Sequence, residues 1–203
     1  MINPKHKNET LESIFSRHSI RNFTDQPVDK SLIDTILQAA NQAPSAHNSQ
    51  SWRFVTIEGN KKRELTELIN NKAADFPRTS SALLRMSSRS ISSAPVIIGV
   101  TNTGELVRHG KDMFQIDEDS AHDFFRTMEI QNSAAAVENM MIAATSLGLG
   151  TVWLGIMFLI KKEVLEFLGE PNGEFMAIIP VGYPKRDAKG PKKRDLDIIA
   201  KKL

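Results

Sequence analysis

In the first quarter of the chain, apolar residues recur at the spacing of amphipathic helices. The earlier pattern predicts a short helix with Asn8 as its N-cap. The later one predicts a helix that begins after Asp29, another N-cap residue, and ends near Pro44. The apolar faces of the two predicted helices consist of Leu11, Ile14 and Phe15, and of Leu32, Ile33, Ile36, Leu37 and Ala40.

Shorter apolar runs predict the strands of a sheet. These runs are residues 52–57, 94–100, 151–155 and 175–181. The run at 94–100 is apolar throughout, which is typical of a buried strand. Between the strands, residues 60–70 predict a surface helix, and residues 161–168 predict a short helix closed by Gly169.

Two polar stretches do not fit either period. Residues 72–92 are polar and basic, and no pattern in them identifies an element. Residues 102–120 are charged and poorly periodic, which predicts a long loop. Because long loops in compact domains are often functional, we interpret residues 102–120 as a mobile lid.

A long helix is predicted over residues 123–147, with Gly148 as the residue that follows its C-cap. Between 133 and 144 its residues are mostly small or methionine, so it is apolar on nearly every side and is expected to lie centrally. Asn132 and Glu138 make this helix too polar to span a membrane.

The composition of the 203 residues predicts one domain, residues 1–203, in a soluble cytoplasmic protein. There is no apolar signal core, and no uninterrupted apolar run is long enough to span a bilayer. The chain has no cysteine, and its five histidines show no ligand spacing, so we predict no metal. The net charge of +2 gives no reason to expect a nucleic-acid partner, although the tail from Pro184 is basic.

The first candidate for chemistry is the arginine segment, residues 17–21. It places Arg17, Ser19 and Arg21 at alternate positions, so an extended backbone would project them to one side. Guanidinium groups and a hydroxyl match the oxygens of a phosphate, and we interpret the segment as an anion site. The alternative is that these arginines belong to a solvated helix end, which is where arginines more often lie when no other motif accompanies them.

The second candidate is the amide loop, residues 44–50, which reads PSAHNSQ. Amide side chains offer donors and acceptors together, which suits the carbonyl and N–H edge of a heterocycle. The alternative is a plain connection from helix to strand with local side-chain hydrogen bonds.

Four separated stretches, taken together, resemble the FMN-dependent nitroreductase family. The matching stretches are RHSIR at 17–21, PSAHNSQSW at 44–52, AATSLGLGTVWLG at 143–155 and PVGYP at 180–184, the last followed by basic PKKR at 191–194. Ser51 departs from the family pattern, which has proline before the tryptophan. Glu138 departs too, because many members carry a neutral residue there.

The resemblance implies an α+β fold with a central, mostly antiparallel sheet flanked by helices. It also implies an intertwined homodimer with FMN at the interface. The implied FMN-binding residues are Arg17, His18, Ser19, Arg21, Pro44, Ser45, Ala46, Asn48, Gln50, Trp153, Leu154, Gly155, Lys192 and Arg194. Of these, Ser45, Ala46 and Asn48, and with them Gln50, would approach the flavin from the partner subunit, and Lys192 and Arg194 would complete the phosphate site. No protein residue is implied to be catalytic, because the chemistry is centred on the flavin.

The implied activity is ping-pong transfer of electrons from NAD(P)H through FMN to nitroaromatic, quinone or flavin acceptors. Two alternatives stay open: a non-enzymatic flavin-binding or sensing protein, and an enzyme that uses the same scaffold for other chemistry such as dehalogenation. A third is a cofactor-free domain whose basic tail is an interaction arm. Three aromatic residues that could roof the flavin, or simply pack in the core, are Phe114, Phe124 and Phe125.

Overall fold

A computed structural model describes residues 8–114, 117–186 and 190–201. Within these residues, four strands form one antiparallel sheet in the order β1-β2-β4-β3. The strands are β1 (Trp52–Ile57), β2 (Val96–Asn102), β3 (Gly150–Thr151) and β4 (Glu174–Gly182). The predicted antiparallel sheet of an α+β fold is therefore confirmed.

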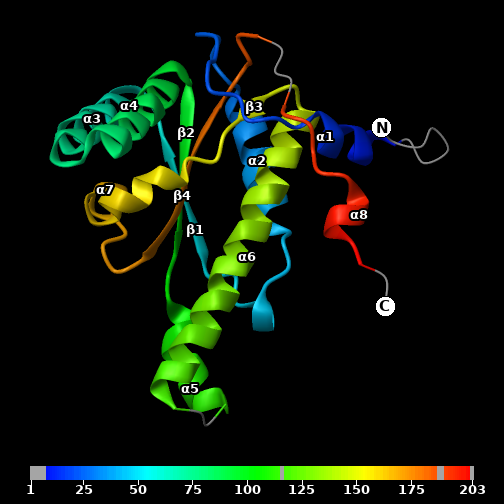
Figure 1. Cartoon of the computed structure of the whole chain (residues 1–203), viewed down its shortest axis with the longest axis vertical. Coiled ribbons are helices and arrows are strands. Elements are labelled where there is room, and N and C mark those ends of the chain that lie inside the picture. Colours follow the sequence, from blue (N-terminus) through cyan, green and yellow to red (C-terminus); the bar gives the residue numbers. More distant parts are fainter. Residues whose placement is uncertain (1–7, 115–116, 187–189, 202–203) are drawn as a thin grey trace.

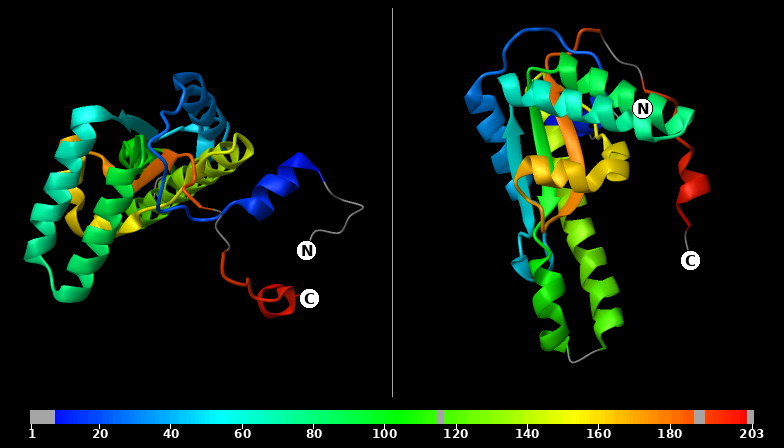
Figure 2. Two further views of the ribbon diagram at one scale, coloured as in Figure 1. Left: turned by 90° about the horizontal axis from the view of Figure 1, so that it is seen from above. Right: turned by 90° about the vertical axis from the view of Figure 1, so that its left-hand side faces the viewer.

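Helices cover both faces of this sheet (Figure 1). On one side lie α2 (Lys30–Asn41) and the long α6 (Glu118–Ser146), and on the other lie α3 (Gly59–Lys72), α4 (Arg78–Ser93) and α7 (Lys161–Leu168). Helix α5 (Glu105–Phe114) pairs with the first turns of α6 in a hairpin that extends past the end of the sheet (Figure 2). The amino-terminal α1 (Glu9–Ser16) packs on α6, and α8 (Leu196–Ile199) stands away from the body of the chain.

Alternate residues of the central strands fill two separate cores. Ile97 and Ile178 pack against α3, α4 and α7, whereas Ile98 and Ile179 pack against α2 and α6. All seven residues of β2 are buried, since helices remove both faces of the sheet from water. This explains the unbroken apolar run in the sequence.

Both predicted N-caps are confirmed by hydrogen bonds. The side chain of Asn8 accepts from the Leu11 amide at 2.9 Å, and Asp29 Oδ1 accepts from the Ser31 amide at 2.7 Å. Gly148 follows α6 with φ +75°, the left-handed backbone expected of the residue after a C-cap. The predicted segments 52–57 and 161–168 coincide with β1 and α7.

The interpretation of residues 102–120 as a loop is wrong, because Glu105–Phe114 is the helix α5. Helix α5 is charged over most of its surface, and its apolar contact with α6 is small. In this contact Leu106 packs with Ala121 and Phe125. Gly110 allows this close approach, since an added Cβ would lie 2.2 Å from the Phe125 ring. Long-range packing on α6 therefore decides the conformation of this stretch.

The unassigned stretch at 72–92 contains α4 and, before it, a 3₁₀ turn, η3 (Ala73–Asp75). The core face of α4 carries Leu84 and Ile91 together with three buried serines, Ser87, Ser88 and Ser90. These serines stand at buried positions where an amphipathic helix usually has large apolar residues. The apolar residues of α4 therefore do not recur at helical spacing in the sequence.

The predicted strand at 151–155 ends at Thr151, and the 3₁₀ helix η4 (Gly155–Ile160) follows almost at once. Leu154 keeps only an isolated bridge to Ile178. The apolar face predicted for α1 is also not part of the core: Ile14 and Phe15 are 42% and 56% exposed.

Candidate cofactor site

The arginine segment follows α1 as extended backbone and joins the sheet beside β3. The Ile20 amide donates to the Thr151 carbonyl oxygen at 2.9 Å, and Ser19 forms a parallel bridge to Thr151. Two sequence motifs that are about 130 positions apart are thereby adjacent in space.

Arg21 lies on the wall of a cavity of about 160 Å³, the Arg21 cavity. Trp153, Leu154 and Gly155 form a second part of this wall. No carboxylate is among the described residues that line it, and Arg21 has no ion-pair partner in the described parts of the chain. The cavity therefore places Arg21, with no carboxylate among its described neighbours, in the same wall as Trp153.

Sequence reasoning missed the third part of this wall, which comes from α4. The lining residues from this helix are Leu83, Met86, Ser87 and Ser90. Ser87 and Ser90 are buried and three positions apart, so they share one helix face toward the cavity. In the sequence the apolar signal of this face is limited to Leu84 and Ile91, seven positions apart, because the serines between them carry no apolar period.

Within the 153–155 segment, the backbone groups are not equivalent. The Leu154 amide donates to the Ile178 carbonyl at 3.0 Å, so this N–H is engaged by the sheet. Gly155 begins η4, and the first N–H groups of a helix have no partner inside it. Gly155 is therefore better placed than Leu154 to donate to a ligand.

Arg17 is directed toward α6 and does not line the Arg21 cavity. Its Nε lies 3.7 Å from Glu138 Oε1, and the Arg17 side chain is 20% exposed. The Glu138 side chain is 51% exposed, so its carboxylate is half in solvent and is not part of the core of α6.

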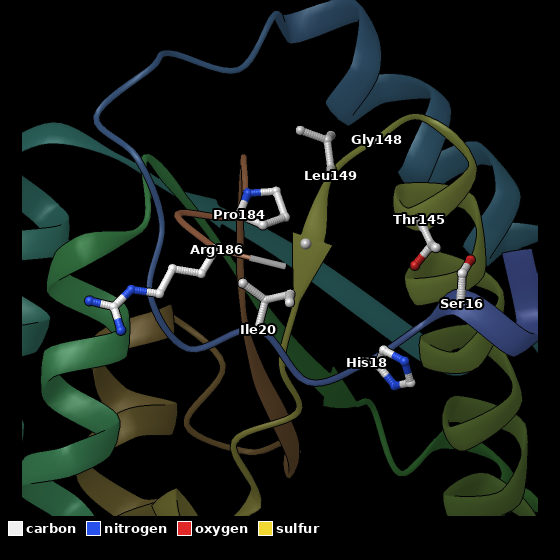
Figure 3. A pocket seen from close by; sticks show the side chains of 9 residues that line it. Ser16, His18, Ile20, Thr145, Gly148, Leu149, Pro184 and Arg186 are labelled. Atoms are coloured by element: carbon white, nitrogen blue, oxygen red, sulfur yellow. The ribbon is translucent and has the colours of Figure 1, made fainter. Parts of the chain in front are cut away.

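His18 and Ile20 line a different cavity, of about 350 Å³ (Figure 3). Ser16 and Thr145 face each other across one end of it, and the Arg186 side chain extends away from them. Gly190 passes beside His18, since an added Cβ at Gly190 would lie 2.6 Å from His18 Nδ1. The carboxy-terminal tail therefore starts next to the arginine segment.

Lys192 and Arg194 do not reach the Arg21 cavity within this chain. Both are exposed, and Lys192 Nζ lies 3.6 Å from Asp195 Oδ1. Their assignment to the phosphate site stays a prediction.

The amide loop lies away from the Arg21 cavity as well. It contains the 3₁₀ turn η2 (Ala46–Asn48) and packs on α6 near Asn132. Asn132 and Glu138, the α6 contacts of the amide loop and of Arg17, are six residues or about 9 Å apart along the helix axis. Figure 1 shows this loop beside the lower half of α6, whereas α1 and β3 lie at its upper end. One chain does not bring Pro44, Ser45, Asn48 or Gln50 to Arg21.

The aromatic residues Phe114, Phe124 and Phe125 form one cluster on the α5–α6 hairpin. Successive ring centroids are 5.1–6.1 Å apart, and the His47 ring of the amide loop lies 5.8 Å from Phe114. Phe125 is fully buried, so it packs in the core, while Phe114 and Phe124 are each 44% exposed. The last two are available to a ligand or a partner.

The described residues contain no group of three or more histidine, aspartate or glutamate side chains that could hold a metal ion. Within the same residues, no helix is long and apolar enough to cross a membrane.

A family model for the nitroreductase family matches residues 14–183, which include the arginine segment, the amide loop and the 150–155 segment. The chain belongs to the nitroreductase family. The family resemblance carried by the four sequence stretches is thereby confirmed.

Relatives within the nitroreductase family differ in the activities that their names state. The FMN reductase [NAD(P)H] of Bacillus subtilis is 29% identical over 91% of this chain and 70% of its own length. Iodotyrosine deiodinase 1 of Rattus norvegicus is 27% identical over 94% of this chain and 68% of its own length. A solved structure from Desulfovibrio desulfuricans, described as a candidate nitroreductase in complex with FMN, is 26% identical, with a TM-score of 0.72 over 97% of this chain and 98% of that one. Family membership alone therefore leaves the reaction open.

Proposed function

We propose that this protein is an FMN-dependent oxidoreductase that takes electrons from NAD(P)H and passes them to nitroaromatic, quinone or flavin acceptors. The observation that carries the proposal is the contact between Ile20 and Thr151, which sets the arginine segment beside the 153–155 wall. The FMN in the Desulfovibrio structure and the name of the Bacillus reductase support the same cofactor.

The donor set of the arginine segment fits a flavin mononucleotide. Arg21 offers a guanidinium to a phosphate, and the described lining of the Arg21 cavity holds no carboxylate that would repel it. Arg17 would add a second guanidinium by exchanging its contact with Glu138 for the phosphate, and Ser19 would add a hydroxyl. Bound FMN would supply the hydride and electron chemistry that these side chains lack.

The residues of this chain would bind and orient that cofactor. Arg21 would neutralise negative charge at the cavity, and the Gly155 amide would donate to an acceptor on the heterocycle. Trp153 is 36% exposed beside the cavity, so its indole would limit the access of water to one edge of the ring system. Leu154 would act through its side chain, because its amide is bonded to Ile178.

The same proposal includes a homodimer. The amide loop lies remote from the Arg21 cavity of its own chain, so Ser45, Ala46 and Asn48 would reach a flavin only from a second copy. The exposed Ile14 and Phe15 of α1 supply apolar surface that such a partner would cover.

The first experiment is a visible absorption spectrum of the purified protein after FMN addition and desalting. Retained flavin is expected in the wild type, and Arg21→Ala should lose it. Arg63→Ala, which removes an exposed arginine of α3, is the matched control and should retain flavin. A wild-type protein that retains no flavin would overturn the proposal.

Turnover then separates the possible reactions. Steady-state NADH or NADPH oxidation with a quinone or nitroaromatic acceptor is expected, and each donor is tested alone. Bound flavin with no turnover would instead favour a binding or sensing role. Release of halide from a halogenated phenol, without acceptor reduction, would favour the chemistry named for the rat relative.

A further inference from the structure

The amide loop is attached to the body of the chain through one buried side chain of α6. Asn132 is only 7% exposed. Its Oδ1 accepts from the Ala46 amide at 3.1 Å, and its Nδ2 donates to Ser49 Oγ at 3.4 Å. One carboxamide thus spans the 46–49 turn from its first residue to its last.

The backbone of this turn adopts a conformation that residues other than glycine seldom adopt. His47, Asn48 and Gln50 have φ values of +52°, +52° and +45°, in the left-handed region. Three such residues within four positions need a surrounding structure that holds them in place.

The remaining hydrogen bonds of the turn are internal to it. The Asn48 amide donates to the Ser45 carbonyl, and the Ser49 amide to the Ala46 carbonyl, each at 3.0 Å. Gln50 donates from its amide to Ser45 Oγ and from Nε2 to Asn48. Within the described chain, the hydrogen bonds that tie residues 45–50 to another element are those of Asn132.

We propose that Asn132 is a positioning residue, which holds the amide loop in the shape that Ser45, Ala46 and Asn48 need in order to contact the flavin of the partner subunit. The inference rests on the proposed function. Asn132 itself does not contact the flavin, and it acts through its hydrogen bonds to the Ala46 amide and the Ser49 hydroxyl. A buried carboxamide in a helix of small and apolar residues is costly unless its hydrogen bonds are used, and here both ends are used.

Helix α6 offers a matched control in Asn139. Its Nδ2 donates to the Ala39 carbonyl at 3.3 Å, so it too links α6 to a backbone group of another segment. Ala39 lies in the last turn of α2, five residues before the amide loop begins, and it is not part of the 46–49 turn that Asn132 holds. Asn132→Ala and Asn139→Ala therefore remove the same chemical group from the same helix, but only the former removes hydrogen bonds made to residues 46–49 themselves.

The test measures three quantities for each variant. They are the FMN dissociation constant, from flavin fluorescence, the melting temperature, and the rate of amide hydrogen exchange in residues 44–51. Asn132→Ala should raise the FMN dissociation constant about tenfold and speed exchange in the loop. Asn139→Ala should lower the melting temperature about as much as Asn132→Ala does. It should leave the FMN dissociation constant and the hydrogen exchange of the loop near wild type. Asn132→Asp should restore most of the affinity, because a carboxylate still accepts from Ala46 and from the Ser49 hydroxyl.

Equal effects of the two alanine variants on FMN affinity, or unchanged exchange in Asn132→Ala, would overturn the inference. Hydrogen exchange is measured on flavin-free protein as well. If the wild type binds no FMN, the proposed function fails, and the role of Asn132 as a flavin-positioning residue fails with it. Faster exchange in Asn132→Ala would in that case show only that Asn132 holds the loop.

Discussion

Ile20 and Thr151 are joined by a 2.9 Å hydrogen bond from the Ile20 amide to the Thr151 carbonyl, and this bond aligns the arginine segment with β3. The next residue back, Gly150, lies directly against the Ile20 side chain, since a Cβ at Gly150 would be 2.7 Å from Ile20 Cγ1. The alignment of the two motifs therefore depends on the absence of a side chain at position 150.

Gly150→Ala should destabilise the fold and loosen the arginine segment. Overpacking of a buried contact costs about 1–3 kcal/mol, measured here as the loss in the free energy of unfolding in urea. Adding Ile20→Ala in the same chain removes Cγ1 and Cγ2, two of the three clashing atoms, and leaves only Cβ at 2.8 Å. The double variant should therefore lose less stability than the two single variants added together. Strict additivity would contradict the contact.

Removing the Glu138 carboxylate should strengthen FMN binding. Glu138 pairs with Arg17 at 3.7 Å, and a phosphate at the arginine segment would compete with it for the same guanidinium. An exposed pair of this kind contributes about 0.5–1 kcal/mol, so Glu138→Gln should lower the FMN dissociation constant by roughly two- to fivefold. Riboflavin, which has no phosphate, is the control ligand, and an equal gain for riboflavin would contradict the explanation.

The basic tail gives a prediction that separates phosphate binding from nucleic-acid binding. Lys192→Ala combined with Arg194→Ala should weaken FMN and leave riboflavin unchanged, because the two cations would act on the phosphate. Lys193→Ala removes an exposed cation from between them and should leave FMN affinity near wild type. Equal losses from all three positions would indicate a general effect of charge. Binding to nucleic acid that weakens with salt, with FMN affinity unaffected, would favour the interaction arm.

Much of the fold could be predicted from the sequence where the signal is carried by neighbouring residues. The caps at Asn8 and Asp29 and the buried run of β2 are local or strongly periodic signals, and they predicted their elements well. Helix α5 was not found this way, because the contacts that pack it, Gly110 against Phe125 and Leu106 against Ala121, are made with α6 and are not visible in its own sequence.

The candidate site shows the same division. The arginine segment and the 153–155 segment were identified by residue type, and the structure places both beside β3. Ser87 and Ser90 were not identified, because serine in a polar stretch carries no apolar period and their burial comes from the fold. Asn132 was noted only for its polarity, since its hydrogen bonds join residues 86 positions apart.

A last prediction concerns Glu129, which lies in α6 and is fully buried. Its Oε1 accepts from the Leu106 amide at 2.8 Å at the start of α5, and its Oε2 has no hydrogen-bond partner in the described residues. Burial raises the pKa of this carboxyl, and the nearby Glu174 carboxylate raises the pKa further. The amides of Leu106 and Gly104 and the charge of Arg108 oppose that shift in pKa.

The sign of the pH effect follows from this raised pKa. Between the pKa of an unfolded glutamate, about 4.3, and the higher native pKa, the native state keeps a proton that the unfolded state has released. The contribution of Glu129 to stability therefore falls as pH rises through that window. Glu129→Gln keeps an acceptor for the Leu106 amide and carries no charge, so its free energy of unfolding should lack this fall.

Urea denaturation of both proteins from pH 4 to 8 measures the difference, in which the other titrating groups cancel. The advantage of the variant should be smallest at pH 4 and grow toward neutral pH, whereas a difference that is constant with pH would show that Glu129 does not titrate in this range.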